Sequence, residues 1–295
     1  NQLKAGAILN YVIIGLNTLV GLAYTPYMLR CLGQNEYGIY SLVASIIAYL
    51  TILDFGFGNA IIRYTAKFRS EGKLKEQWEM FGMFVIVYSI IGLIAFCGGL
   101  GLYFNVDVLF DRTMTSDDLA QAQIMMLLLT FNLAFTFPLS IFGSIITAYE
   151  NFIFQRVVNI IRILLSTAVM IALLAIGFKA IALVVAQTVF NLLVLIINYL
   201  YCKKQLKIQI IFNKFNTSFL KEISIYSFWI FLNAVMDKIY WGTGQFVLGA
   251  ICGTVAVAIF SVAILLQQMY MTFSTAICNF LLPRITAMVA KNNNP

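Results

Sequence analysis

The sequence contains no histidine and is poor in charge. Only 11% of its 295 residues are charged, against about 25% in soluble domains, whereas 61% are hydrophobic. Without histidine, the chain lacks the commonest general base at neutral pH and the commonest side-chain ligand of transition metals. This composition excludes an ordinary soluble domain, indicates an integral membrane protein, and gives no reason to expect a cofactor.

Cysteine is also scarce, and its positions are scattered. The five cysteines form no CxxC pair, so neither a zinc site nor a disulfide framework is expected. The net charge of +7 comes from lysines and arginines at the ends of hydrophobic runs, not from a basic patch with interleaved aromatic residues. Nucleic acid is therefore not an expected partner.

Long hydrophobic runs fill most of the chain. About eight of them reach the roughly 20 residues that a helix needs to cross a bilayer. They cover residues 6–29, 37–62, 81–104, 119–148, 152–178, 180–201, 223–250 and 255–282. The sequence thus predicts an all-α integral membrane protein with about eight transmembrane helices. Very short turns make the first two, the fifth and sixth, and the last two antiparallel neighbours.

The basic residues predict how the chain lies in the membrane. If the N-terminus is cytoplasmic, nearly all lysines and arginines between the segments fall on the cytoplasmic side, as the positive-inside rule requires. The longest cytoplasmic loop, residues 202–221, is basic and is expected to lie near anionic lipid headgroups. We interpret it as a linker between a six-helix N-terminal lobe, residues 1–201, and a partial C-terminal lobe of two helices, residues 222–295.

A short internal repeat relates these two lobes. Shifting the sequence by 220 positions places Gly33 on Gly253, Ile39-Tyr40-Ser41 on Ile259-Phe260-Ser261, and Asn17 on Asp237. Parallel repeats of this kind occur in transporters whose lobes are related by an axis along the membrane normal. The second lobe would then be incomplete, and we expect the chain to be a fragment of a longer transporter.

Polar side chains recur at helical spacing on several of the predicted helices. The serines, threonines and glycines are best interpreted as contacts that hold helices together in lipid. The amides are more numerous than a dry bundle could satisfy, which favours a water-filled cavity between the helices. The amides assigned to this cavity are Asn17, Asn159, Asn191, Asn233 and Gln268.

Ionisable residues inside membrane helices are costly, and they are the strongest candidates for the transport pathway. Asp54 lies near the middle depth of the second segment, and Asp237 and Lys238 are adjacent in the seventh. Arg162 is ten residues into the fifth segment, about 15 Å deep, and Arg156 is shallower. Asp54 could carry a coupling ion or pair with Arg162; both alternatives are open.

The motif around Asp54 leads to a family resemblance. Residues 53–59 read LDFGFGN and are followed by Arg63-Tyr64, and the two glycines would let a neighbouring helix approach closely or let the segment bend. With YGIY at 37–40, AYENF at 148–152 and LPR at 282–284, this motif resembles the bacterial polysaccharide-unit flippases of the MOP superfamily, which are MATE-like transporters. These proteins handle O-antigen and capsule units and have twelve to fourteen helices, so this chain departs from the pattern by stopping after about eight.

The resemblance implies export of an undecaprenyl-diphosphate-linked oligosaccharide repeat unit across the bacterial inner membrane by alternating access. Amides would bind the sugars, and Arg156, Arg162 and Lys238 are candidates to hold the diphosphate. Asp54 and Asp237 are candidates for coupling to H⁺ or Na⁺. No enzymatic step is expected, and polysaccharide polymerase or assembly proteins are possible partners besides membrane lipids.

Three other interpretations compete with this one. A cation-coupled multidrug exporter of the MATE type would share the architecture but would bind cationic drugs with acids, whereas cations are here at least as frequent. A membrane-bound glycan polymerase or acyltransferase usually needs a histidine or clustered acids, and often a large outer loop. The chain could also be an inert truncation product.

Overall fold

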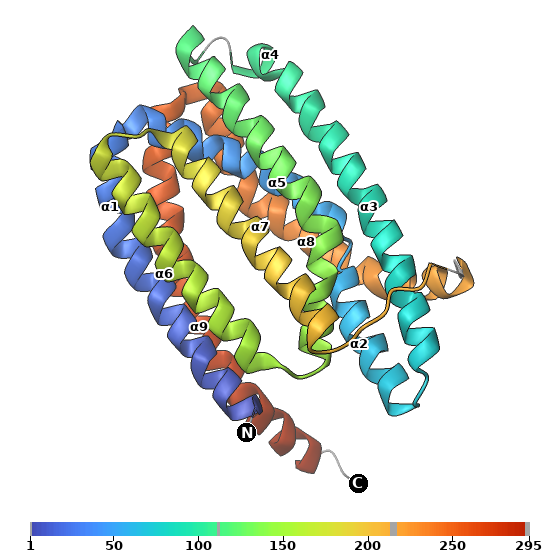
Figure 1. The fold of residues 1–295 in the computed structure, drawn as a ribbon. Helices are drawn as coiled ribbons and strands as arrows, with labels where there is room; N and C mark the ends of the chain where they lie inside the picture. The colour runs from blue at the N-terminus through green and yellow to red at the C-terminus, as the bar shows by residue number, and fades with distance from the viewer. Residues whose placement is uncertain (1, 111–112, 213–216, 293–295) are drawn as a thin grey trace.

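The protein is built from α-helices (Figure 1). The computed structural model describes residues 2–110, 113–212 and 217–292. The elements are α1 (Gln2–Leu50), the 3-10 helix η1 (Thr51–Asp54), α2 (Phe57–Ser70), α3 (Leu74–Phe104), α4 (Val106–Phe110), α5 (Ser116–Ala148), α6 (Phe152–Ile176), α7 (Ala180–Lys204), α8 (Thr217–Cys252) and α9 (Thr254–Asn292). No strand occurs among these described residues, which confirms the predicted all-α fold.

The long helices are suited to crossing a membrane. Among the described residues, six helical stretches are long and apolar enough. There are seven if Phe219–Ile225 and Ser227–Cys252, the two parts of α8 that meet at 42°, form one bent span. The first stretch, Ile8–Ser70, has 63 residues and would measure about 95 Å as one straight helix, three times the thickness of the hydrocarbon layer. It turns at Gly33, whose φ of 77° and ψ of 169° are not helical, so it supplies two crossings. Residues 2–32 are the first part of α1 and residues 34–50 are its second part. The chain is a multi-pass membrane protein.

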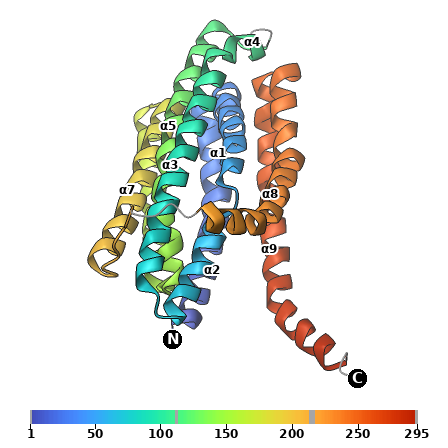
Figure 2. The same ribbon diagram turned by 90° about the vertical axis from the view of Figure 1, so that its right-hand side faces the viewer.

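The helices pack side by side as one bundle. α5 lies between α3 and α7, α1 packs against both α6 and α9, and α8 lies beside α1 and α9 (Figures 1 and 2). Small residues let α3 and α5 approach closely: a Cβ added to Gly92 would stand 2.6 Å from the carbonyl oxygen of Ala134. The apolar core formed by the second part of α1 with α2, α3 and α5 includes Leu42, Ile61, Phe84, Tyr88 and Ile145.

Outward faces of the bundle carry large apolar side chains. On α3, for example, Ile90, Leu93 and Ile94 are all more than half exposed. In a membrane these side chains contact lipid, so helices that are apolar all round need no hydrophilic face. This explains why charge is confined to so few positions in the sequence.

The turns of the two predicted repeats have the same backbone feature and lie against each other. Gly33 and Gly253, which the 220-residue shift aligns, have φ values of 77° and 83°. Asn35 accepts a hydrogen bond from Thr254 Oγ1 and donates one to Asp118 Oδ1 over 2.8 Å. This geometry agrees with a repeat, while the division into lobes at residues 202–221, of which 213–216 lie outside the described part, stays a prediction.

Candidate functional site

The second predicted span is broken at Asp54 instead of running through as one helix. α1 ends at Leu50, η1 ends at Asp54 and α2 begins at Phe57. Between them, Phe55 and Gly56 have left-handed φ values of 52° and 69°. Glycine adopts such a φ without strain, but a bulky residue such as phenylalanine rarely does. Gly56 also lies against α8, because a Cβ there would stand 2.6 Å from Ile230 Cγ2.

The Asp54 carboxylate is held at this break by a tyrosine. Tyr88 of α3, which is 1% exposed, donates from its hydroxyl to Asp54 Oδ1 over 2.7 Å. α2 starts just beyond Asp54, so the positive end of the helix dipole lies close to the acid. Within the described part of the chain no ion pair joins Asp54 to Arg162; the partner is Tyr88. Helix breaks at membrane depth are where many transporters place substrate or ion sites.

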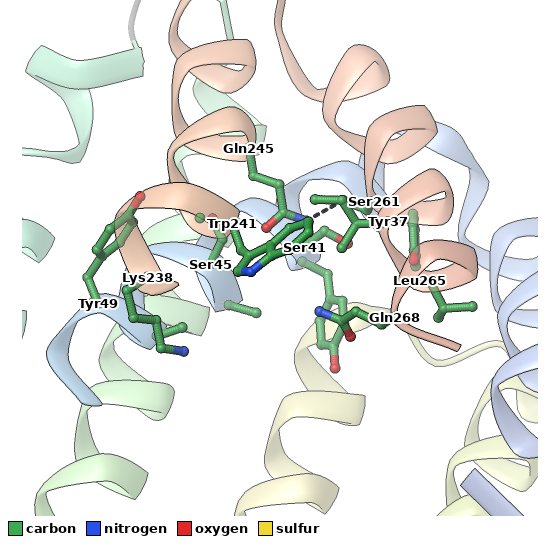
Figure 3. A pocket seen from close by; sticks show the side chains of 15 residues that line it. Tyr37, Ser41, Ser45, Tyr49, Lys238, Trp241, Gln245, Ser261, Leu265 and Gln268 are labelled. Carbon is green, nitrogen blue, oxygen red and sulfur yellow. Dashed lines mark hydrogen bonds between the residues drawn. The ribbon is translucent and has the colours of Figure 1, made fainter. Parts of the chain in front are cut away.

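A polar cavity of about 310 Å³ lies between the second part of α1, α8 and α9 (Figure 3). We call it, together with the smaller cavity described next, the α1–α8–α9 groove. It is lined by Tyr37, Tyr40, Ser41, Ala44, Ser45, Ala48, Tyr49, Lys238, Trp241, Gly242, Gln245, Ser261, Ile264, Leu265 and Gln268. Gln245 donates to Ser261 Oγ over 2.9 Å, which joins α8 to α9 at the edge of the cavity. In Figure 3, Lys238 and Gln268 extend toward each other beside the ring of Trp241.

A second cavity of about 250 Å³ continues the groove along α9. It shares Leu265 and Gln268 with the first cavity and adds Asn17, Thr18 and Gly21 from the first part of α1. The groove therefore runs between α1 on one side and α8 and α9 on the other.

The groove offers neutral hydrogen-bonding groups and aromatic faces. Hydroxyls of tyrosine and serine and the amides of Gln245 and Gln268 can donate and accept, and Trp241 offers a large ring. Of the described residues that line the groove, Lys238 alone carries a charge. Such a lining suits a ligand that is rich in hydroxyls and carries no positive charge.

Three of the predicted site residues, Asn17, Lys238 and Gln268, meet at the groove. Asn191 does not line it: its side-chain nitrogen donates to Asn132 Oδ1 over 2.7 Å and to Thr136 Oγ1 over 2.9 Å. These bonds tie α7 to α5, the role that the small polar residues of the stripes were expected to play.

The remaining predicted residues lie outside the groove. On α6, Arg162 donates from Nε to Asn159 Oδ1 over 3.2 Å, and these two residues and Arg156 are half-buried. On α8, Asn233 donates to the carbonyl oxygen of Trp229 over 3.0 Å, and Asp237 is exposed. A role in transport for these five stays a prediction.

Sequence reasoning missed several residues of the site. Tyr88 was not expected as the partner of Asp54, and Tyr49, Trp241 and Gln245 were not assigned to the pathway. One signal was present in the repeat: Ser41 and Ser261, which the 220-residue shift aligns, both line the groove. Within the described residues no group of three or more potential metal ligands is clustered.

Comparisons with known proteins agree with this architecture. A solved structure of a protein named "protein A" superposes with a TM-score of 0.73 at 15% sequence identity. The alignment covers 96% of this chain but 64% of that one, so the chain spans less than two thirds of the length of the structure it matches, and the likeness concerns the fold alone. No curated protein matches the chain significantly. The family model described as "Polysaccharide biosynthesis protein" matches residues 3–289, and the chain therefore belongs to the polysaccharide biosynthesis protein family.

Proposed function

We propose that the protein exports a polyprenyl-diphosphate-linked oligosaccharide repeat unit, of the undecaprenyl type, across the bacterial inner membrane. Membership of the polysaccharide biosynthesis family supports a role in polysaccharide synthesis or export. The finer assignment adds the lipid-linked cargo, the N-terminus on the cytoplasmic side, and alternating access between a lobe of residues 1–201 and a lobe that contains residues 222–295. Polysaccharide polymerase or assembly proteins would receive the exported unit.

The α1–α8–α9 groove is the observation that carries this proposal. Its hydroxyls, amides and aromatic rings match the many neutral hydrogen bonds and the apolar ring faces of a sugar. It lies between helices that the repeat assigns to different lobes, so a relative movement of the lobes would change access to it.

The charge in the groove favours this cargo over a cationic drug. Lys238 can contact a phosphate or an acidic sugar, and no acid lies among the described lining residues. A MATE-type multidrug exporter, the second candidate, would need an acid there. Asp54 is kept as the candidate for coupling to H⁺ or Na⁺, because it is an acid at a helix break held by only one side-chain hydrogen bond among the described residues.

The proposal is tested by restoring surface polysaccharide in cells that lack their own flippase, using the full-length protein. Trp241→Ala should lower export about tenfold, because an aromatic face and its contacts are lost from the groove. Trp229→Ala is the matched control: Trp229 is on the same helix, is 67% exposed and does not line the groove. Both variants are first compared for their amount in the membrane.

Two results would count against the proposal. Equal export by the two tryptophan variants would remove the groove from the pathway. Efflux of cationic drugs without restoration of any glycan would replace the proposed function with the multidrug alternative.

A further inference from the structure

Another cavity lies next to the helix break, against residues 224–231 of α8. It has a volume of about 460 Å³, within the range of small-molecule sites, and is lined by Phe55, Phe57, Val87, Ile91, Ser224, Ser227, Phe228 and Phe231. Apart from the two small serines its side chains are hydrocarbon. We call it the phenylalanine cavity. None of the residues that sequence reasoning assigned to the pathway line it.

The backbone at the break directs a ring into this cavity. Phe55 has a φ of 52°, which is unfavourable for a bulky residue and persists only where the surroundings enforce it. Its ring stacks on Phe231 of α8, with centroids 4.8 Å apart and planes inclined by 28°. Phe57, two residues further on, lies 5.9 Å from Phe55. The break that positions Asp54 thus also builds an aromatic wall between α2 and α8.

The phenylalanine cavity and the groove lie one after the other along one face of α8. Phe231 lines the cavity and Lys238 lines the groove. Seven residues are close to two helical turns, so both side chains leave nearly the same side of α8, about 10 Å apart along its axis. Along that face the lining changes from phenyl rings to a lysine, a tryptophan and a glutamine. This order matches an amphiphile with a linear hydrocarbon chain and a polar, negatively charged head.

We propose that the phenylalanine cavity binds the hydrocarbon chain of a polyprenyl phosphate while its headgroup lies in the groove at Lys238. The isoprenoid identity of the chain and the placement of the headgroup rest on the proposed function; the apolar lining that receives the chain is a property of the cavity itself. The phospholipid acyl chains of the bilayer are the competing occupants, and the test measures the polyprenyl chain against them.

The chain site is tested by photocrosslinking, independently of any glycan. The full-length protein carries p-benzoyl-phenylalanine in place of Phe228, which lines the cavity and is 50% exposed, and is reconstituted in phospholipid vesicles with a small fraction of polyprenyl monophosphate. The same probe in place of Leu93, a lipid-facing residue of α3 that is 64% exposed, reports the bulk lipid. We expect polyprenyl adducts at position 228 to exceed those at position 93 about tenfold after correction for lipid content.

A pair of variants separates a filled cavity from a disturbed helix. Ser224→Phe adds a ring to the lining and should reduce the enrichment at position 228 to the level at position 93. Ile225→Phe adds the same ring on the neighbouring residue, which is 62% exposed and outside the cavity, and should leave the enrichment intact.

Each outcome decides the matter. Equal polyprenyl adducts at positions 228 and 93, or an enrichment that Ser224→Phe does not reduce, would overturn the chain site. Enrichment that is lost in Ser224→Phe and kept in Ile225→Phe supports it. Because the vesicles contain no glycan, the two proposals can fail separately. Enrichment at position 228 without restored polysaccharide in cells would reject the proposed function and leave the chain site standing. Restored polysaccharide without enrichment would reject the chain site and leave the proposed function standing.

Discussion

Asn191 and Gln268 are both amides on transmembrane helices, and the structure gives them opposite surroundings. Asn191 is half-buried and donates to Asn132 and Thr136 on the adjacent helix α5. Gln268 is exposed and lines the groove together with Lys238 (Figure 3). One amide connects two helices, whereas the other has room for a ligand.

The comparison shows that residue type alone does not mark a transport pathway in a membrane protein. A buried amide without a partner is costly in a bilayer, so helices either satisfy it with each other or surround it with water and ligand. On the α3–α5–α7 side of the bundle the helices satisfy the amide with each other. On the α1–α8–α9 side the amide is left to water and ligand. Asp54 lies between these cases, because it has a partner but sits at a helix break.

The largest expected effect comes from separating the closely packed helices. Gly92→Leu should lower the free energy of unfolding by about 3 kcal/mol, because its side chain meets the Ala134 backbone, which cannot move aside. Gly101→Leu on the same helix is the control, since nothing lies within 4 Å of a Cβ there. Thermal unfolding in detergent measures both. If the two variants unfolded at the same temperature, the tight packing of α3 on α5 would be disproved.

The hydrogen bond at the helix break should come next in size. Tyr88→Phe leaves the Asp54 carboxylate without that donor at a partly buried position, which should cost about 1–3 kcal/mol. Asp54→Asn keeps a hydrogen-bond acceptor and should cost less. The double variant should then show a coupling free energy between the two sites. Additive effects would mean that the 2.7 Å contact contributes nothing to stability.

The same two variants separate a structural acid from a coupling acid. If Asp54 carries a coupling ion, export by Asp54→Asn loses its dependence on the proton or sodium gradient, whereas Tyr88→Phe keeps it. Export is measured at several imposed gradients and normalised to folded protein. Gradient-dependent export by Asp54→Asn would assign Asp54 to the structure alone.

The two amides themselves give a smaller and more specific test. Asn191→Leu should lower the free energy of unfolding by about 0.6 kcal/mol, the average for polar contacts between membrane helices, and leave export per folded protein unchanged. Gln268→Leu should leave the free energy of unfolding unchanged and lower export per folded protein, since its amide lines the groove. Thermal unfolding and polysaccharide export are measured on both variants. A loss of export in Asn191→Leu at normal stability would place Asn191 in the pathway after all.

The fold was largely predictable because long apolar runs can form little besides membrane helices. The short turns and the glycine shared by the repeat also indicated where helices reverse, and Gly33 and Gly253 confirm both turns. The break at Asp54 was harder to predict. Gly56 and Gly58 allowed a bend, but Ile230 of α8, against which Gly56 packs, is far away in the sequence.

The site was predictable only in part, because spacing on one helix does not say what lies opposite. Asn191 and Gln268 both belong to polar stripes, and only the neighbouring helices distinguish them. Tyr88 and Trp241 were overlooked because aromatic residues are common in membrane helices, so neither stood out. The repeat was the better guide, since it aligned Ser41 with Ser261 on opposite walls of the groove.

The smallest effect is expected from a charged pair outside the membrane. Lys73 donates to Glu71 over 2.7 Å in the turn between α2 and α3, and this hydrogen bond lowers the pKa of the Glu71 carboxyl. A lowered pKa in the folded state stabilises the fold above the ordinary pKa of glutamate, and the contribution is lost as the pH falls through the folded value. Water screens both side chains, because they are 52% and 34% exposed.

Lys73→Ala should therefore unfold at nearly the temperature of the unaltered protein at neutral pH. Any small difference should vanish in acid, where Glu71 is protonated in both. Thermal unfolding at neutral and acidic pH measures this directly, beside Asn191→Leu. A shift as large as that of Asn191→Leu would show that a strong charge contact at the surface equals a neutral one between helices. We expect instead that the neutral contact matters more, because lipid offers Asn191 no substitute partner whereas water offers one to Lys73.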